Sequence, residues 1–206
     1  MAHAVGVATS PTALPGLRGR FAPAGTFLDT ATYGLPPVAA SQALARAAAA
    51  WAEGTYDPRA CDADIARARA AWATLVGADP AAVAVGHQVS PFVGLVAAAL
   101  RPGSRVLVPE GEFTSVTFPF AAAPGVRVRE APLERLADAV DGRTAVVACS
   151  AVQSSDGRVA DLDAILRAAA VVGAFTVVDA TQAASWLALD ASKVRLFDPE
   201  TEKAII

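Results

Sequence analysis

The stretch from residue 83 to residue 180 alternates short β-branched runs with helical patterns, and this alternation constrains the fold more than any other feature. Apolar runs bounded by Gly, Pro or Asp lie at 83–86, 105–109, 126–131, 144–150 and 175–180, and helical patterns lie between them at 90–100, 133–140 and 161–173. Strands that alternate with helices predict crossover units and a parallel sheet. Two runs, TAVVACS and FTVVDA, are apolar at both alternating sets of positions, so helices should cover both faces. We therefore predict a three-layer α/β fold with a mainly parallel sheet.

The region before residue 78 has a helical pattern instead. The dipeptide Pro36-Pro37 should open an Ala-rich helix that ends near Glu53, before Gly54. A second helix is predicted over 62–76, with Asp62 as its N-terminal cap and Gly77 as its stop.

Three segments follow from these patterns. Residues 1–35 are rich in Pro, Gly and Thr and are predicted to form an N-terminal arm. Residues 36–194 should form the main α/β domain. Residues 195–206, with a polar DPETEK turn and a short apolar end, do not fit another crossover unit.

Composition excludes several classes of protein. The chain of 206 residues is 54% apolar with a net charge of −3, which gives no reason to expect nucleic acid or an anionic membrane as partner. The longest uncharged central stretch, 89–100, is far shorter than the ~20 residues that span a bilayer. Two distant cysteines predict neither a disulfide scaffold nor a metal site. Without a signal-like start, we expect a soluble cytoplasmic protein.

Ligands of parallel sheets gather at the carboxyl ends of the strands, so the loops there are the candidate site. After 83–86, a Gly turn leads to Gln88, Val89 and Ser90 at a helix start, where backbone N–H groups and a hydroxyl can hold an anion. A merely capped helix is the alternative. His87 is expected to be a partly exposed loop histidine.

Three later loops add planar and polar groups. Phe113 follows the strand at 105–109, where its ring can stack on a planar ligand or fill the core. Ser154 and its neighbour Gln153 are candidates by position alone. Asp179 ends an apolar run and should be half-buried, which is costly unless the carboxylate is paired. Gln182 can present an amide to the same space, whereas a helix-capping role for Asp179 is the alternative.

Other ligand-binding motifs are missing from the sequence. No GxGxxG follows a strand, no GxxxxGK[ST] occurs, and no GxSxG elbow is present. Dinucleotide, P-loop and nucleophile-elbow chemistry are therefore not predicted.

Five segments together resemble the class V aminotransferase family of fold-type I pyridoxal-phosphate (PLP) enzymes, which includes cysteine desulfurases, kynureninases and isopenicillin-epimerase-like proteins. They are FLDTATYGLPP, VAVGHQVSPFVGLVAAAL, VLVPEGEFTSVTFPF, SAVQSSDGRVADLDAI and VVDATQAASWLALDAS, within residues 27–194. The resemblance implies PLP as cofactor, an amino acid as substrate, aldimine and quinonoid chemistry, and a homodimeric parent enzyme.

The resemblance also implies roles for single residues. Asp179 would pair with the protonated pyridine nitrogen, which keeps the ring an electron sink. Gln182 would hydrogen-bond the phenolic oxygen, and Phe113 would stack on the ring face. Gln88, Val89 and Ser90 would hold the phosphate. Ser154 stands where many members have Asn, so that contact would be weaker or lost.

The chain departs from the family at its end. The family's Schiff-base lysine follows the Asp by about two dozen residues, and Lys203 falls at that distance, yet DPETEKAII is not the expected strand and loop. The small C-terminal domain is missing, so we expect a C-terminally truncated chain. Three hypotheses stay open: a PLP enzyme, an inactive fragment or pseudo-enzyme with a partial PLP site, and an unrelated α/β binding domain.

Overall fold

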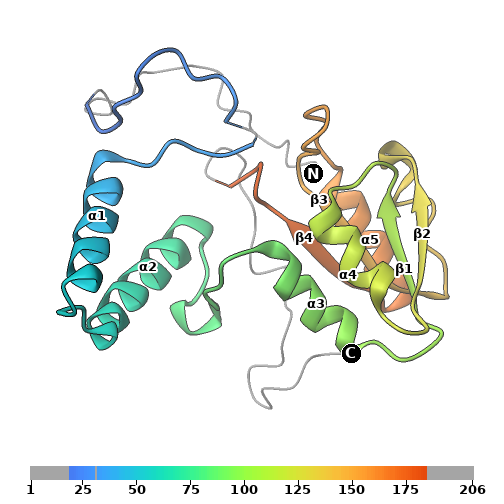
Figure 1. Cartoon of the computed structure of the whole chain (residues 1–206). Helices are drawn as coiled ribbons and strands as arrows, with labels where there is room; N and C mark the ends of the chain where they lie inside the picture. The colour runs from blue at the N-terminus through green and yellow to red at the C-terminus, as the bar shows by residue number, and fades with distance from the viewer. Residues whose placement is uncertain (1–18, 31, 185–206) are drawn as a thin grey trace. The chain divides into compact units, whose positions relative to one another are not determined.

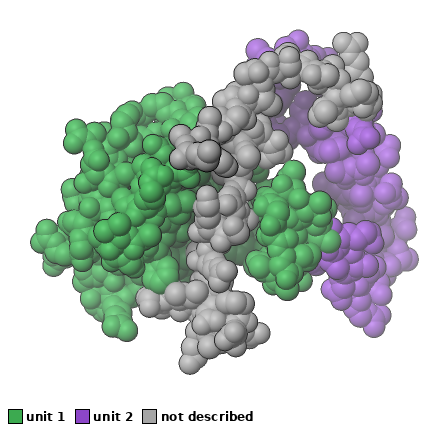
Figure 2. Space-filling view, turned by 180° about the vertical axis from the view of Figure 1, so that it is seen from behind, with its two compact units in different colours: residues 1–5, 69–206 green, residues 6–68 purple. Residues whose placement is uncertain are grey.

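The computed structural model describes residues 19–30 and 32–184. The chain divides into two compact units, residues 6–68 and residues 69–206 together with 1–5 (Figure 2). The division falls inside the helix α2 (Cys61–Val76).

The unit of residues 6–68 is helical, and it contains α1 (Val38–Ala52), the 3-10 turn η1 (Pro58–Ala60) and the start of α2. The predicted first helix is confirmed, with Gly54 in the left-handed conformation (φ 72°) just past its end. Asp62 is not an N-terminal cap, because η1 runs directly into α2 and places Asp62 in the first helical turn. Asp57 caps η1, and its side chain accepts a hydrogen bond from the Arg59 N–H.

The unit that follows is built on a four-stranded sheet (Figure 1). Its elements are η2 (Pro80–Ala82), α3 (Val89–Ala99), β1 (Arg105–Pro109), α4 (Thr114–Ala122), β2 (Arg127–Ala131), η3 (Leu133–Arg135), β3 (Thr144–Ser150), α5 (Leu162–Val172) and β4 (Phe175–Asp179). The strand order is β2-β1-β3-β4, and every neighbouring pair is parallel. The predicted parallel sheet is confirmed.

Helices cover both faces of the sheet, as predicted. On one face, α3 and α4 pack Val93 and Phe120 against Val106 and Val146 of the strands. On the other face, η3 and α5 pack against the alternate residues, and Leu136 and Ile165 contact Leu107 and Val147. Consecutive side chains of β1 and β3 therefore enter opposite cores, which is why their sequences are apolar throughout.

Two predicted elements were wrong. The run 83–86 is extended but is not a strand, because no strand within the described residues lies beside it to pair with its backbone. The pattern at 133–140 forms η3 and further turns rather than an α-helix. Leu133 and Leu136 are three residues apart, so a 3-10 turn buries both on one side.

The structure also contains α4, which the sequence patterns did not predict. Pro119 lies inside this helix and removes one backbone hydrogen bond. In the described part of the chain, no helix has the length and apolar character needed to cross a membrane.

Candidate functional site

The carboxyl ends of β1, β3 and β4 lie along one edge of the sheet, because all strands are parallel and Ser150 is in register with Asp179. After β1 the chain enters α4 on one face, and after β3 it enters α5 on the other. The two connections therefore diverge between β1 and β3. In open α/β sheets this switch point is where ligands bind.

Asp179 ends β4 and is half-buried, as predicted. Its Oδ1 accepts a hydrogen bond from the Thr181 N–H at 2.8 Å, which closes a turn after β4; no helix follows it within the described residues. Its backbone oxygen accepts from the Ala151 N–H at 2.9 Å, which ties the end of β4 to β3. Among the residues that the structure describes, no ion pair involves this carboxylate. Gln182 lies three residues further on and is also half-buried.

Phe113 is not a core residue. Its side chain is 50% exposed, and it immediately precedes the first turn of α4. Its backbone N–H donates to Glu112 Oε1 at 2.7 Å. A half-exposed ring at a strand end has one surface available to a planar ligand.

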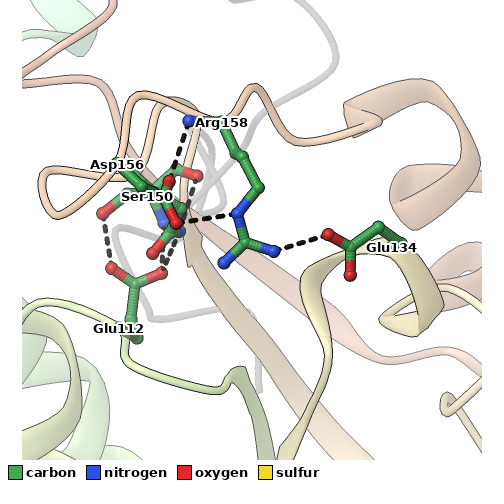
Figure 3. A network of polar contacts seen from close by, with 6 residues as sticks. Glu112, Glu134, Ser150, Asp156 and Arg158 are labelled. Atoms are coloured by element: carbon green, nitrogen blue, oxygen red, sulfur yellow. Dashed lines mark hydrogen bonds and ion pairs between the residues drawn. The ribbon is translucent and has the colours of Figure 1, made fainter.

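Glu112 was missed by the sequence analysis. Its side chain is buried, with 7% exposed, and Figure 3 shows its carboxylate directed at Ser150. Oε2 accepts from the Ser150 N–H at 2.7 Å and from Gln153 Nε2 at 2.9 Å, and Oε1 accepts from Ser150 Oγ at 2.6 Å. An acidic residue one Gly-containing turn after a buried strand was the available signal.

Gln153 is therefore buried and hydrogen-bonded within the protein, and its side chain is not available to a ligand. It is 2% exposed, and its backbone N–H donates to the Arg158 oxygen at 2.9 Å. The next residue, Ser154, is half-buried, and within the described residues its hydroxyl takes part in no hydrogen bond. The Ser154 hydroxyl is thus available to a ligand.

The outer side of the same loop has a surface ion-pair network. Arg158 contacts Asp156 at 2.8 Å and also pairs with Glu134 of η3 (Figure 3). The backbone N–H and then the guanidinium of Arg158 lower the pKa of the Asp156 carboxyl. Exposed pairs of this kind contribute little to stability, so we assign the network to loop geometry alone.

The start of α3 leaves backbone donors available. Gln88 is its N-terminal residue but makes no side-chain capping bond. Pro91 lacks an N–H, so the unpaired donors of this helix end belong to Gln88, Val89 and Ser90. Gly86 precedes them, and a Cβ atom there would overlap the tip of the Phe92 ring.

The structure groups most predicted site residues at one sheet edge. Phe113, Ser154, Asp179 and Gln182 follow the ends of β1, β3 and β4. Val89 packs against the core cluster beneath α3 and α4, but no described hydrogen bond joins residues 88–90 to the other loops. His87 is exposed, as predicted. Lys203 lies outside the described residues.

Cys149 is a buried thiol rather than a nucleophile. Burial first, and then the negative charges of Glu112 and Asp179, raise the pKa of this thiol to about 12. A thiol protonated at neutral pH is a poor nucleophile. The same result indicates that both carboxylates act electrostatically on the end of β3.

Comparison with known proteins identifies the family. The sequence profile described as aminotransferase class-V matches residues 44–197, about three quarters of the chain. The chain belongs to the class V aminotransferase family. A comparison with curated proteins finds no significant match.

Solved structures of PLP enzymes and their relatives have the same fold. The cysteine desulfurase CsdA from Escherichia coli superposes with a TM-score of 0.69 at 21% identity, over 85% of this chain and 50% of that one. A variant of C-DES with glycine covalently linked to its PLP cofactor gives 0.67 at 21% identity, over 81% and 49%. Cysteine desulfurase from Thermococcus onnurineus NA1 gives 0.65 at 18% identity, over 81% and 46%. This chain therefore spans about half the length of these relatives.

Proposed function

We propose that this chain binds pyridoxal 5'-phosphate at the carboxyl edge of the sheet and serves PLP-dependent chemistry on an amino acid. The observation that carries the proposal is Asp179, a half-buried carboxylate with no ion-pair partner among the described residues. A half-buried anion at a ligand edge favours a cationic partner. The protonated pyridine nitrogen of PLP is such a partner.

The other groups at this edge fit the rest of the cofactor. The N–H groups of Gln88, Val89 and Ser90 would hold the phosphate, and the helix dipole of α3 favours a negative charge there. The half-exposed ring of Phe113 would stack on the pyridine face. Gln182 would contact the phenolic oxygen, with Ser154 near the same atom.

When bound, PLP supplies an electron sink for negative charge at the α-carbon of an amino acid. The chain's contribution would be to orient the ring and to keep its nitrogen protonated through Asp179. C-DES has been solved with its reaction product cysteine persulfide, which supports an amino-acid substrate here. Because Cys149 is a protonated buried thiol, it would not be the sulfur acceptor of a desulfurase.

Turnover, a homodimeric assembly and a cytoplasmic location are further parts of the proposal. Lys203 stays the predicted residue for covalent attachment of the cofactor. The alternative is a chain of 206 residues that binds PLP without catalysing a reaction. Assays with added amino acids separate the two, since only a competent chain converts the substrate.

The test is a titration of the purified chain with PLP, followed by the visible absorbance of bound cofactor. We expect binding by the wild type and about tenfold weaker binding by Asp179→Asn, since a lost charge pair of about 1.4 kcal/mol changes affinity tenfold. Asp163→Asn, an exposed carboxylate on α5, is the matched control and should bind normally. Lys203→Ala should lose the visible band only if this lysine attaches the cofactor.

Absence of binding by the wild-type chain would refute the proposal. Equal binding by the wild type and Asp179→Asn would refute the role of Asp179, even if PLP binds elsewhere on the protein.

A further inference from the structure

The loop after β1 and the loop after β3 diverge at the switch point, yet side-chain hydrogen bonds join them. Glu112 lies in the first loop, and its partners Ser150 and Gln153 lie 38 and 41 residues further along the chain. Figure 3 shows the Glu112 carboxylate directed at Ser150. Glu112 therefore connects the two loops that border the proposed PLP site.

The carboxylate is fully used by its neighbours. Oε1 accepts from the Phe113 N–H and Ser150 Oγ, and Oε2 accepts from the Ser150 N–H and Gln153 Nε2. A carboxylate accepts at both oxygens, whereas an amide has only one acceptor atom. Each oxygen here serves one backbone N–H. An amide at position 112 would therefore leave a backbone N–H unpaired in either orientation.

The contact with Phe113 links Glu112 to the ligand side of the edge. The Phe113 N–H is held at 2.7 Å from Oε1, and the residue has an extended backbone (φ −62°, ψ 139°) just before α4. This backbone geometry sets the direction of the half-exposed ring. The ring would shift if the loop after β1 lost its connection to β3.

The charge of Glu112 also acts at this edge. No ion pair of the described residues involves Glu112 or Asp179, and both negative charges raise the pKa of Cys149, which lies between them in β3. Two carboxylates without a cationic partner among the described residues favour a cationic ring over a neutral one.

We propose that Glu112 is a positioning residue for the cofactor: its buried carboxylate joins the loops after β1 and β3 and so fixes the Phe113 ring against the pyridine ring of PLP. This inference rests on the proposed function. Within the part of the chain that the structure describes, Glu112 hydrogen-bonds to Phe113, Ser150 and Gln153, so its effect on the cofactor would pass through these residues.

The test compares Glu112→Gln with Glu110→Gln in the full chain of 206 residues. Glu110 is exposed and only two residues away, so its substitution removes the same charge without breaking the network. The probe is pyridoxine 5'-phosphate, which lacks the aldehyde and so reports non-covalent affinity, measured by calorimetry. The second readout is the induced circular dichroism of PLP per mole bound, which reports ring orientation.

We expect Glu112→Gln to bind pyridoxine 5'-phosphate about tenfold more weakly, equivalent to about 1.4 kcal/mol, with altered induced dichroism. Glu110→Gln should stay within about twofold, as surface substitutions usually do. Ser150→Ala removes one of the four hydrogen bonds and keeps the charge, so it should weaken binding about threefold. If Glu112→Gln does not fold, the affinity of Ser150→Ala tests the inference in its place.

The inference is overturned if Glu112→Gln melts at a lower temperature but binds with unchanged affinity and dichroism, because its role would then be structural only. It is equally overturned if Glu112→Gln is unfolded while Ser150→Ala binds like the wild type. Failure of the wild type to bind either compound would overturn the proposed function and this inference together. If the wild type binds and Glu112→Gln has the same affinity and the same induced dichroism, the inference about Glu112 is overturned but the proposed function is not.

Discussion

The end of β1 and the end of β4 each carry a carboxylate at the same sheet edge, but the two are used differently. Glu112 is 7% exposed and accepts four hydrogen bonds from the protein. Asp179 is half-buried, and its side chain accepts one backbone hydrogen bond. A saturated carboxylate belongs to the structure, whereas one with remaining acceptor capacity suits a ligand. At this edge Glu112 is therefore bonded within the protein, whereas Asp179 keeps acceptor capacity for a ligand.

The loop that contains Glu112 leads into α4, and we expect the largest effect on stability in the core beneath this helix. Phe120 is fully buried, whereas Phe118 of the same helix is 65% exposed. Phe120→Ala should lower the free energy of unfolding by about 3–5 kcal/mol. Phe118→Ala should change it by less than about 0.5 kcal/mol. Urea denaturation measures both, and equal effects would show that α4 is not packed as described.

Substitution of Glu112 should affect the stability of the fold more than substitution of Asp179. Glu112→Gln leaves a buried backbone N–H unpaired and should destabilise the fold by about 1–3 kcal/mol. Asp179→Asn keeps an oxygen for the Thr181 N–H and should cost less than about 1 kcal/mol. Thermal unfolding without cofactor gives both values. A larger loss for Asp179→Asn than for Glu112→Gln would reverse the comparison.

Cys149, between the two carboxylates, gives a pH-dependent test. Its folded pKa of about 12 lies above the ordinary value of 9.0. Below pH 9 both folded and unfolded thiols are protonated; between 9 and 12 only the unfolded thiol ionises. Stability should therefore fall by about 1.4 kcal/mol per pH unit in that window. Cys149→Ala should flatten this slope, as pH-dependent urea denaturation would show; an unchanged slope in Cys149→Ala contradicts the assignment.

The smallest effect is expected at the loop before α3. An alanine at Gly86 pushes against the flexible end of the Phe92 ring, so the fold should lose less than about 1 kcal/mol. Affinity for inorganic phosphate or PLP should fall a few-fold, because residues 88–90 move with the loop. Gly94→Ala, at a glycine with open space around it, is the matched control. Unchanged affinity in Gly86→Ala would remove this loop from the proposed site.

Local patterns predicted the sheet because strands buried on both faces leave a direct trace in the sequence, as at 105–109 and 144–150. The same logic failed at 83–86, since an apolar run becomes a strand only beside a partner. The helix α4 was missed because Pro119 interrupts a pattern that tertiary packing nevertheless stabilises.

The site was predicted in the same uneven way. Half burial of Asp179 followed from its place at the end of an apolar run. The exposure of Phe113 had to be seen in the structure, because an aromatic after a strand suits a core equally well. The position of Glu112 after a buried strand and a Gly turn was visible in the sequence, but the partners of its carboxylate were not, since they lie 38 and 41 residues away. Such long-range pairing has no local sequence pattern.

The pairing of Asp179 with the pyridine nitrogen is tested most directly by the ¹⁵N chemical shift of that nitrogen in labelled PLP bound to the chain. We expect a protonated nitrogen at neutral pH in the wild type and in Asp163→Asn, and an unprotonated one in Asp179→Asn. A bound cofactor whose nitrogen is unprotonated in the wild type, or unaffected by Asp179→Asn, would contradict this pairing.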